Sequence, residues 1–187
     1  MDTGGNQGRR LRTVYDFDEL QAQIRSAKKM DPGAFYRQDS RGPRYCQGDI
    51  LSLEMRLPYI NDQLQIKAIR EPFQYWVVAS NTCAMSRTGA DIKLAYINLH
   101  PLHRVEEPSE AEMLSGYGSY HEFYLPAWSS DAGVAGWFIN FSEVACLQLE
   151  GLLVRDVPVV NRLSDPAWAL FHACSVRFWA RDDGRHD

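Results

Sequence analysis

Residues 48–99 contain the stretch of sequence that decides the fold. The segment GDILSLEMRL occupies residues 48–57, QYWVVAS occupies residues 74–80, and IKLAYINL occupies residues 92–99. Apolar and polar residues alternate in the first and third segments, which is typical of strands with one buried face, whereas the second is nearly continuous apolar, as in a central strand. Polar loops separate the three segments. This order predicts a small, strongly bent β-barrel rather than a helical or doubly wound domain.

Further strands are expected around this stretch. Residues 64–68 alternate between apolar and polar side chains and predict a second half-buried strand. Two more strands are expected at residues 121–126 and 136–140, on either side of a loop. Residues 146–155 carry leucines that alternate with polar residues, and they predict a strand as well.

Helices are expected at both ends of the chain. Residues 16–29 predict a short amphipathic helix. The clearest helix begins at Ser164-Asp165-Pro166, because Asp165 can cap it and Pro166 suits its first position, where a missing N–H costs nothing. It is expected to end near Arg181 and to carry an apolar stripe formed by Ala167, Leu170, Phe171, Cys174 and Phe178. A short helix is also expected to start at Pro108.

The predicted fold class is therefore α+β: a small bent SH3-like β-barrel with an N-terminal helix and a C-terminal capping helix. We expect a disordered arm at residues 1–13, a helix and connecting loop at residues 14–45, a β-barrel domain with inserted loops at residues 46–162, and a C-terminal helix at residues 163–181.

Composition and charge bound the function. The chain has 187 residues, of which 45% are hydrophobic, enough for one domain with an ordinary core. Residues 1–45 contain nine Lys or Arg against six Asp or Glu, whereas residues 46–187 contain eleven against eighteen. The acidic body disfavours broad nucleic-acid affinity. We expect no membrane partner, no secretory signal and a cytoplasmic location, because the chain lacks a long apolar run.

The four cysteines stand far apart and form no Cys-x-x-Cys pair. Neither a disulfide framework nor a zinc ribbon is indicated, and free, mostly buried thiols are expected. We expect no metal and no cofactor.

Residues 47–100 resemble the MazF/PemK/Kid toxin family. The resemblance rests on Gly-Asp-Ile-Leu at residues 48–51, Trp-Val-Val-Ala-Ser-Asn at residues 76–81, and Thr-Gly at residues 88–89 before another strand. It implies an SH3-like barrel, often dimeric, in a family of endoribonucleases that belong to toxin-antitoxin systems.

The family's catalytic positions hold different residues here. Its catalytic Arg lies beside an Arg-Pro pair before the central strand, where this chain has only Arg70. Its catalytic Thr follows the next strand, but residues 98–102 contain no Thr. An Arg and a hydroxyl would be needed to stabilise phosphorane charge and to activate a ribose hydroxyl. In this chain Arg70 with His100 or Thr82 would have to replace them.

Two functions follow. The preferred prediction is a cytoplasmic interaction or regulatory protein built on a toxin-like SH3 barrel, within a bacterial conflict or defence system, with a protein partner and a possible homodimer. The alternative is a MazF-like endoribonuclease toxin that cleaves single-stranded RNA. Its candidate catalytic residues are Arg70, Thr82, Cys83 and His100, and its candidate nucleic-acid-binding residues are Arg56, Arg70 and Arg87.

Several other residues could have either a chemical or a purely structural role. Cys83 could act as a thiolate with His100 or His103 as base, or it could plug the end of the barrel. The same residues with Cys46 could form a zinc site, although the cysteines lack close spacing and structural histidines in a turn are preferred. Asp49 is either a catalytic acid or a turn cap.

Dense aromatic residues could form a stacking surface for single-stranded nucleic acid or hot spots of a protein interface, and the protein interface is preferred. They are Tyr75, Trp76, Tyr117, Tyr120, Phe123, Tyr124, Trp128, Trp137 and Phe138.

Overall fold

The computed structural model describes residues 17–27, 30–38, 44–82, 96–128 and 133–180. Within them lie several helices and antiparallel sheets, so the expected α+β class is confirmed. The predicted disordered arm at residues 1–13 and the first part of the strand predicted from residue 92 lie outside the described residues.

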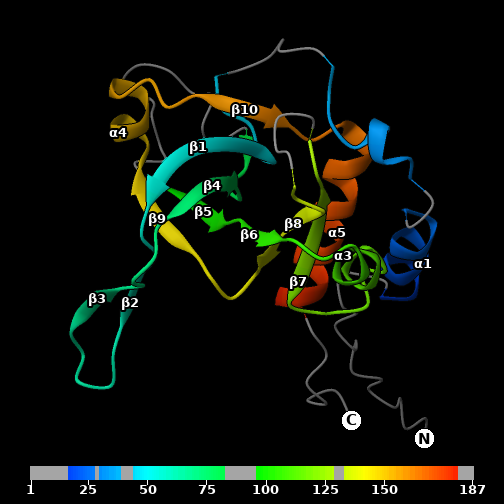
Figure 1. The fold of residues 1–187 in the computed structure, drawn as a ribbon, viewed down its shortest axis with the longest axis horizontal. Coiled ribbons are helices and arrows are strands. Elements are labelled where there is room, and N and C mark those ends of the chain that lie inside the picture. The colour runs from blue at the N-terminus through cyan, green and yellow to red at the C-terminus, as the bar shows by residue number, and fades with distance from the viewer. Residues whose placement is uncertain (1–16, 28–29, 39–43, 83–95, 129–132, 181–187) are drawn as a thin grey trace, which may run out of the picture.

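The largest sheet has five antiparallel strands in the order β10–β1–β4–β5–β9 (Figure 1). These strands are β10 (Val159–Arg162), β1 (Asp49–Met55), β4 (Phe73–Val78), β5 (Tyr96–Pro101) and β9 (Ala145–Gln148). β1, β4 and β5 fall within or overlap the three segments whose apolar patterns predicted strands. These predictions are confirmed for the residues that are described.

Strand β4 lies at the centre of this sheet because its side chains are buried on both faces. Tyr75 and Val77 belong to one apolar core, whereas Trp76 and Val78 belong to a second core on the other side of the sheet. Successive side chains of a strand point to opposite faces, so a nearly continuous apolar run fits a strand with a core on each side.

The larger core is completed by a three-stranded sheet and three helices (Figure 1). The strands, in the order β6–β8–β7, are β6 (His103–Val105), β8 (Gly136–Asn140) and β7 (Glu122–Pro126). The helices are α1 (Phe17–Ala27), α3 (Pro108–Ser115) and α5 (Asp165–Trp179), and α1 packs against α5. The helices, β7 and β8 were expected, whereas β6 was not predicted from the sequence.

The predicted apolar stripe of α5 is confirmed, because Ala167, Leu170, Phe171 and Cys174 are buried. The predicted cap is wrong by one residue. The Ser164 side chain, not that of Asp165, accepts a hydrogen bond from the backbone N–H of Ala167.

The second core lies on the face of the five-stranded sheet opposite the larger core. Register shifts between Ile50 and Leu51 and between Ser52 and Met55 mark irregular positions along β1, and such bulges increase the local twist of a strand. In the described part of the chain, the outer strands β10 and β9 do not pair with each other, so the sheet is open and no closed barrel is present. The SH3-like barrel therefore stays a prediction.

One predicted strand is partly wrong. The segment expected to be a strand at residues 146–155 is extended only to Gln148 and continues as helix α4 (Leu149–Val154). Leu149 and Leu152 are the buried residues of this helix, and their spacing of three places them on one helical face. A short leucine-rich segment fits both the two-residue period of a strand and the 3.6-residue period of a helix. Here the contact of Leu149 and Leu152 with the second core favours the helix.

The remaining strands form a separate hairpin. β2 (Pro58–Ile60) and β3 (Ile66–Ala68) pair only with each other within the described residues, and the hairpin projects from the body of the molecule (Figure 1). We call residues 58–68 the arm.

Substitution of Gly136 tests the packing of the smaller sheet. A Cβ at Gly136 would lie 2.4 Å from Cε2 of Tyr124, so Gly136→Ala must displace a buried ring whose hydroxyl donates to the carbonyl of Ala135. We expect the free energy of unfolding to fall by about 1–3 kcal/mol, measured by urea denaturation. Gly118→Ala is the control, because a Cβ there has no neighbour within 4 Å. Equal stability of the two variants would contradict the packing.

Candidate functional site

Arg70 and His100, the predicted catalytic pair, lie in opposite environments. The Arg70 side chain is 96% exposed, and its Nε lies 3.9 Å from Oε1 of Glu71. His100 lies in β5 and is only 2% exposed. A guanidinium almost wholly in water does not contact an imidazole that is almost wholly buried. The structure therefore does not bring these two residues together.

The other predicted RNA-site residues have different surroundings. Arg56 is exposed, and the hydrogen bond from Ile69 N to Leu57 O places it at the same end of the arm as Arg70. Thr82 accepts a hydrogen bond at its Oγ1 from the backbone N–H of Gln47, at 2.8 Å. Cys83 and Arg87 lie outside the described residues, so their predicted roles stay predictions.

His100 is held by its surroundings. Its Nδ1 lies 2.8 Å from the carbonyl oxygen of Glu143, which can only accept, so Nδ1 carries the proton. Burial lowers the pKa of His100, and the contacts with Glu143 oppose this shift only in part. The ring also meets that of Phe141 edge-on. A buried neutral imidazole with a committed N–H is a structural group, not an accessible base.

His103 shares the same glutamate. Its Nε2 lies 2.5 Å from Oε2 of Glu143, and its ring stacks on Phe138 with a centroid separation of 4.8 Å. Glu143 thus contacts both histidines, one through its backbone and one through its carboxylate. This arrangement fastens the turn before β9 to strands β5 and β6.

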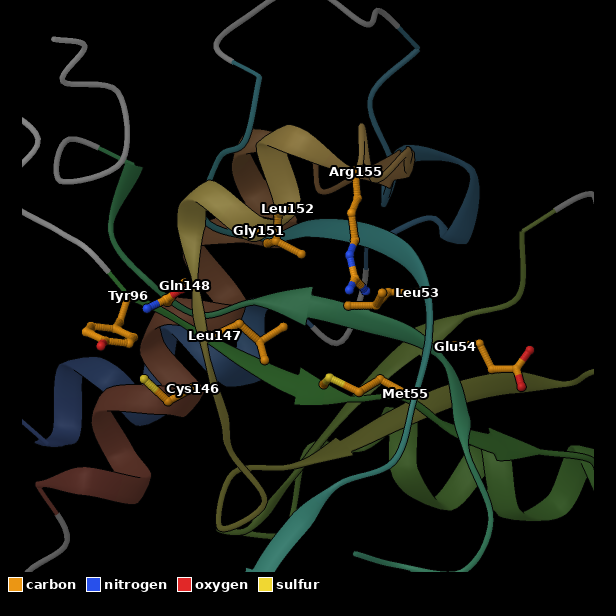
Figure 2. A pocket seen from close by; sticks show the side chains of 10 residues that line it. All are labelled: Leu53, Glu54, Met55, Tyr96, Cys146, Leu147, Gln148, Gly151, Leu152 and Arg155. Atoms are coloured by element: carbon orange, nitrogen blue, oxygen red, sulfur yellow. The ribbon is translucent and has the colours of Figure 1, made fainter.

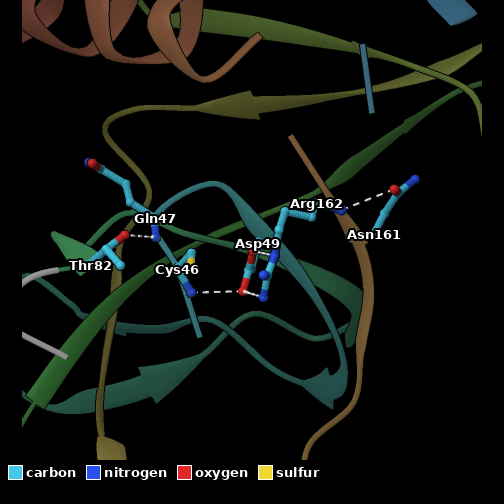
Figure 3. Close-up of polar contacts among 6 residues, drawn as sticks. All are labelled: Cys46, Gln47, Asp49, Thr82, Asn161 and Arg162. Atoms are coloured by element: carbon cyan, nitrogen blue, oxygen red, sulfur yellow. Dashed lines mark hydrogen bonds and ion pairs between the residues drawn. The ribbon is translucent and has the colours of Figure 1, made fainter. Parts of the chain in front are cut away.

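A buried ion pair lies at the start of β1 (Figure 3). Asp49 is fully buried, and its two carboxylate oxygens accept from Nε of Arg162 at 2.7 Å and from Nη2 at 2.9 Å. The backbone N–H of Cys46 donates to the same carboxylate at 2.7 Å. Asp49 was weighed as a catalytic acid or a turn cap, and it does cap this turn. Its second partner, Arg162 on β10, is far away in sequence and was missed.

The electrostatics of this cluster do not favour nucleophilic chemistry. Burial, followed by the nearby Asp49, raises the pKa of the Cys46 thiol. Burial also raises the pKa of Asp49, although the hydrogen bonds from Arg162 and Cys46 act in the opposite direction. A thiol with a raised pKa is a poor nucleophile. The Asp49 carboxylate is fully buried and accepts three hydrogen bonds, so it is not accessible from solvent.

The described residues contain no group of three or more His, Cys, Asp or Glu side chains that could hold a metal ion. The zinc hypothesis also needs Cys83, which lies outside them. Of the other cysteines, Cys174 is buried, Cys46 is half-buried and Cys146 is exposed. The expected burial of the thiols therefore does not hold for Cys146.

A pocket of about 480 Å³ lies between β1, β9 and α4, on the side of the five-stranded sheet that carries the second core (Figure 2). Leu53, Met55, Leu147 and Leu152 contribute apolar walls. The side chain of Arg155 extends from the end of α4 toward Leu53 (Figure 2). Its lining residues come from segments that lie far apart in the sequence, so only the three-dimensional fold reveals it.

The arm carries four of the exposed large apolar side chains, those of Tyr59, Ile60, Leu64 and Ile66. The register pairs Pro58 with Ala68 and Ile60 with Ile66, which places these four side chains on one face. Ile60 is 67% exposed and Ile66 is 80% exposed. Residues 66–68 do form a strand, but the prediction that it is half-buried is wrong, because all three of its residues are exposed.

The turn at the end of the arm is built on Asn61. Its side-chain Oδ1 accepts from the backbone N–H groups of Gln63 and Gln65, at 3.1 and 2.9 Å. Leu64 follows in the left-handed region, with φ of 58°, and is 85% exposed. Gly or Asn is usual at such a position, so a leucine there is unfavourable within the chain itself.

The dense aromatic residues mostly form core. Tyr75, Trp76, Tyr117, Phe123, Tyr124 and Trp137 are buried. Trp128 and Phe138 pack against the larger core, and Tyr120 is 46% exposed. Neither a stacking surface nor an aromatic hot spot is assembled from this set.

Comparison of the chain with protein-family models found no match, and comparison with curated protein sequences found none either. The resemblance to the MazF/PemK/Kid family therefore stays a prediction. None of the helices in the described part of the chain is long and apolar enough to cross a membrane.

Removal of the Asp49 carboxylate tests the buried ion pair. Asp49→Asn leaves the guanidinium of Arg162 buried without a counter-charge, so we expect the free energy of unfolding to fall by about 3–5 kcal/mol. Asp156→Asn is the control, because the side chains of its pair with Arg44 are 89% and 46% exposed. It should change stability by less than about 1 kcal/mol. Denaturant unfolding of both variants measures the difference, and similar losses would refute the assignment.

The buried His100 predicts a pH dependence. Because its pKa is lower in the folded state than the ordinary value of 6.5, the unfolded chain binds the proton first as the pH falls. The stability contributed by neutral His100 is complete above the pKa of this residue in the unfolded chain. It is lost as the pH falls from that pKa toward the lower pKa of the folded state. His100→Asn keeps an N–H donor for Glu143 without titrating. We expect the wild type to lose more stability than this variant between about pH 7.5 and pH 5.5. Parallel pH profiles would contradict the prediction.

Proposed function

We propose that the protein is a cytoplasmic interaction or regulatory protein that binds a protein partner through the arm. Its body is proposed to be a bent, SH3-like half-barrel of the toxin family, and its setting a bacterial conflict or defence system. The observation that supports this function is the apolar face of the arm, which is exposed to water on an element that touches no core.

Physical reasons favour a partner for this face. A two-stranded hairpin is marginally stable in water by itself. Burial of one large aliphatic side chain contributes about 1.5–3 kcal/mol, and Ile60, Leu64 and Ile66 forgo this contribution within the chain. Contact with a partner would recover it.

The endoribonuclease alternative has weaker support. Catalysis would need a cation and a base or hydroxyl that meet at one phosphate. Arg70 and His100 do not meet, and the Thr82 hydroxyl already accepts a hydrogen bond from Gln47. Arg56 and Arg70 could still contact RNA at the base of the arm, which makes RNA a partner to test.

Two assays on the purified full chain distinguish these functions. Incubation with labelled single-stranded RNA should give no cleavage by the wild type, and cleavage that disappears in Arg70→Ala would overturn the proposed function. Crosslinking of the full chain, by itself and in a cell extract, should instead capture a second copy of the chain or another protein through the arm.

Ile60→Ser should abolish this capture, because it removes an apolar contact from the arm. Met113→Ser is the matched control, since Met113 on α3 is 70% exposed and Ile60 is 67% exposed. Equal capture by both variants, or none by the wild type, would refute a role for the arm.

A further inference from the structure

The arm and the pocket have complementary properties. The tip of the arm presents an exposed leucine, Leu64, beside an acidic residue, Asp62. The pocket presents apolar walls beside a basic residue, Arg155, and its lining also includes Glu54, whose carboxylate points away from Arg155 (Figure 2). Neither Asp62 nor Arg155 forms a salt bridge in the part of the chain that the structure describes. A branched apolar side chain with a neighbouring carboxylate matches an apolar pocket with a guanidinium at its mouth.

The arm cannot fill the pocket of its own chain without reversing direction. Leu53 and Met55 line the pocket and belong to β1, which leads directly into the arm at Pro58. The pocket therefore lies near the base of the arm, whereas Leu64 lies at its tip. With about 3.3 Å per residue, each side of the hairpin extends roughly 17 Å.

This placement suits a two-fold axis. When two arms cross in opposite directions, the tip of each arrives at the base of the other. A two-fold interface is self-complementary, so one contact between tip and pocket necessarily occurs twice. The apolar faces of the two arms, which carry Ile60 and Ile66, would meet between these contacts.

We propose that the partner of the arm is a second copy of this chain, bound by reciprocal exchange of arms. Leu64 of each copy enters the pocket of the other, and Asp62 of each pairs with Arg155 of the other. This inference rests on the proposed function, because it names the partner of the same arm.

The conformation of Leu64 supports this assignment. The turn is held by Asn61 and needs no leucine, and the left-handed backbone at this position disfavours a branched side chain. The unfavourable residue becomes favourable only when its side chain is buried elsewhere.

A charge exchange tests the proposal. Sedimentation of the wild-type full chain should show a dimer. Asp62→Arg alone and Arg155→Asp alone should each dissociate, because each homodimer would then place two like charges together twice. An equimolar mixture of the two variants should restore a dimer, since both contacts of the mixed pair join opposite charges. A mixture that stays monomeric, or single variants that remain dimeric, would overturn the proposal.

A second variant separates folding from assembly. Leu64→Gly relieves the left-handed position, so it should unfold at the same or higher denaturant concentration than the wild type. The same variant should weaken the dimer by about tenfold or more, because it removes the side chain at the centre of the contact. Met113→Gly is unsuitable as a control inside a helix, so Met113→Ser serves again and should leave the dimer unchanged.

Failure of this inference is distinguishable from failure of the proposed function. A monomeric wild type whose arm captures a different protein overturns the arm exchange and leaves the proposed function standing. RNA cleavage that depends on Arg70 overturns the proposed function. The sedimentation experiment with Asp62→Arg and Arg155→Asp then tests separately whether the chain forms the proposed dimer.

Discussion

The burial of β4 on both faces is the constraint on which the rest of the structure depends. Four consecutive residues of this strand, Tyr75–Val78, are buried, and they alternate between two cores. Apolar side chains on both faces of a strand need cover on both sides, because exposure of either set to water is unfavourable. The smaller sheet and helices α1, α3 and α5 cover one side, and α4 covers the other (Figure 1).

The two sides are not equally complete. The larger core is enclosed by helices and a second sheet, whereas the second core is covered by α4 and by loop residues such as Tyr45, Leu57 and Val157. The pocket beside Leu53 and Leu147 opens at this less complete side. The arm leaves the body from the same region, since it continues from β1. Both features that support a binding function thus arise from one incompletely closed sheet.

The buried polar groups have structural roles. Asp49 needs a partner because an unpaired buried charge is costly, and Arg162 supplies it from the neighbouring strand. His100 is neutral and gives its N–H to Glu143. Since these groups are already engaged, they do not provide a catalytic site among the described residues, whereas the arm keeps its apolar face free.

Local patterns were reliable where one face of a segment had to be buried. The alternation in β1, the apolar run of β4 and the stripe of α5 were all predicted correctly, because the period of the pattern states which face meets a core. The same reasoning was wrong for residues 64–68, where the alternation is real but no core lies beneath it. It was partly wrong for residues 146–155, where leucine spacing fits both a strand and a helix.

The sequence by itself therefore determined the α+β class, the central position of β4 and the flanking helices. Only the tertiary structure decided that Asp49 pairs with Arg162, that Arg70 and His100 lie in different environments, and that the arm is exposed while a pocket opens near its base. The physical reason is that periodicity records which face of a segment is apolar. It does not record which distant segment, or which second molecule, covers that face.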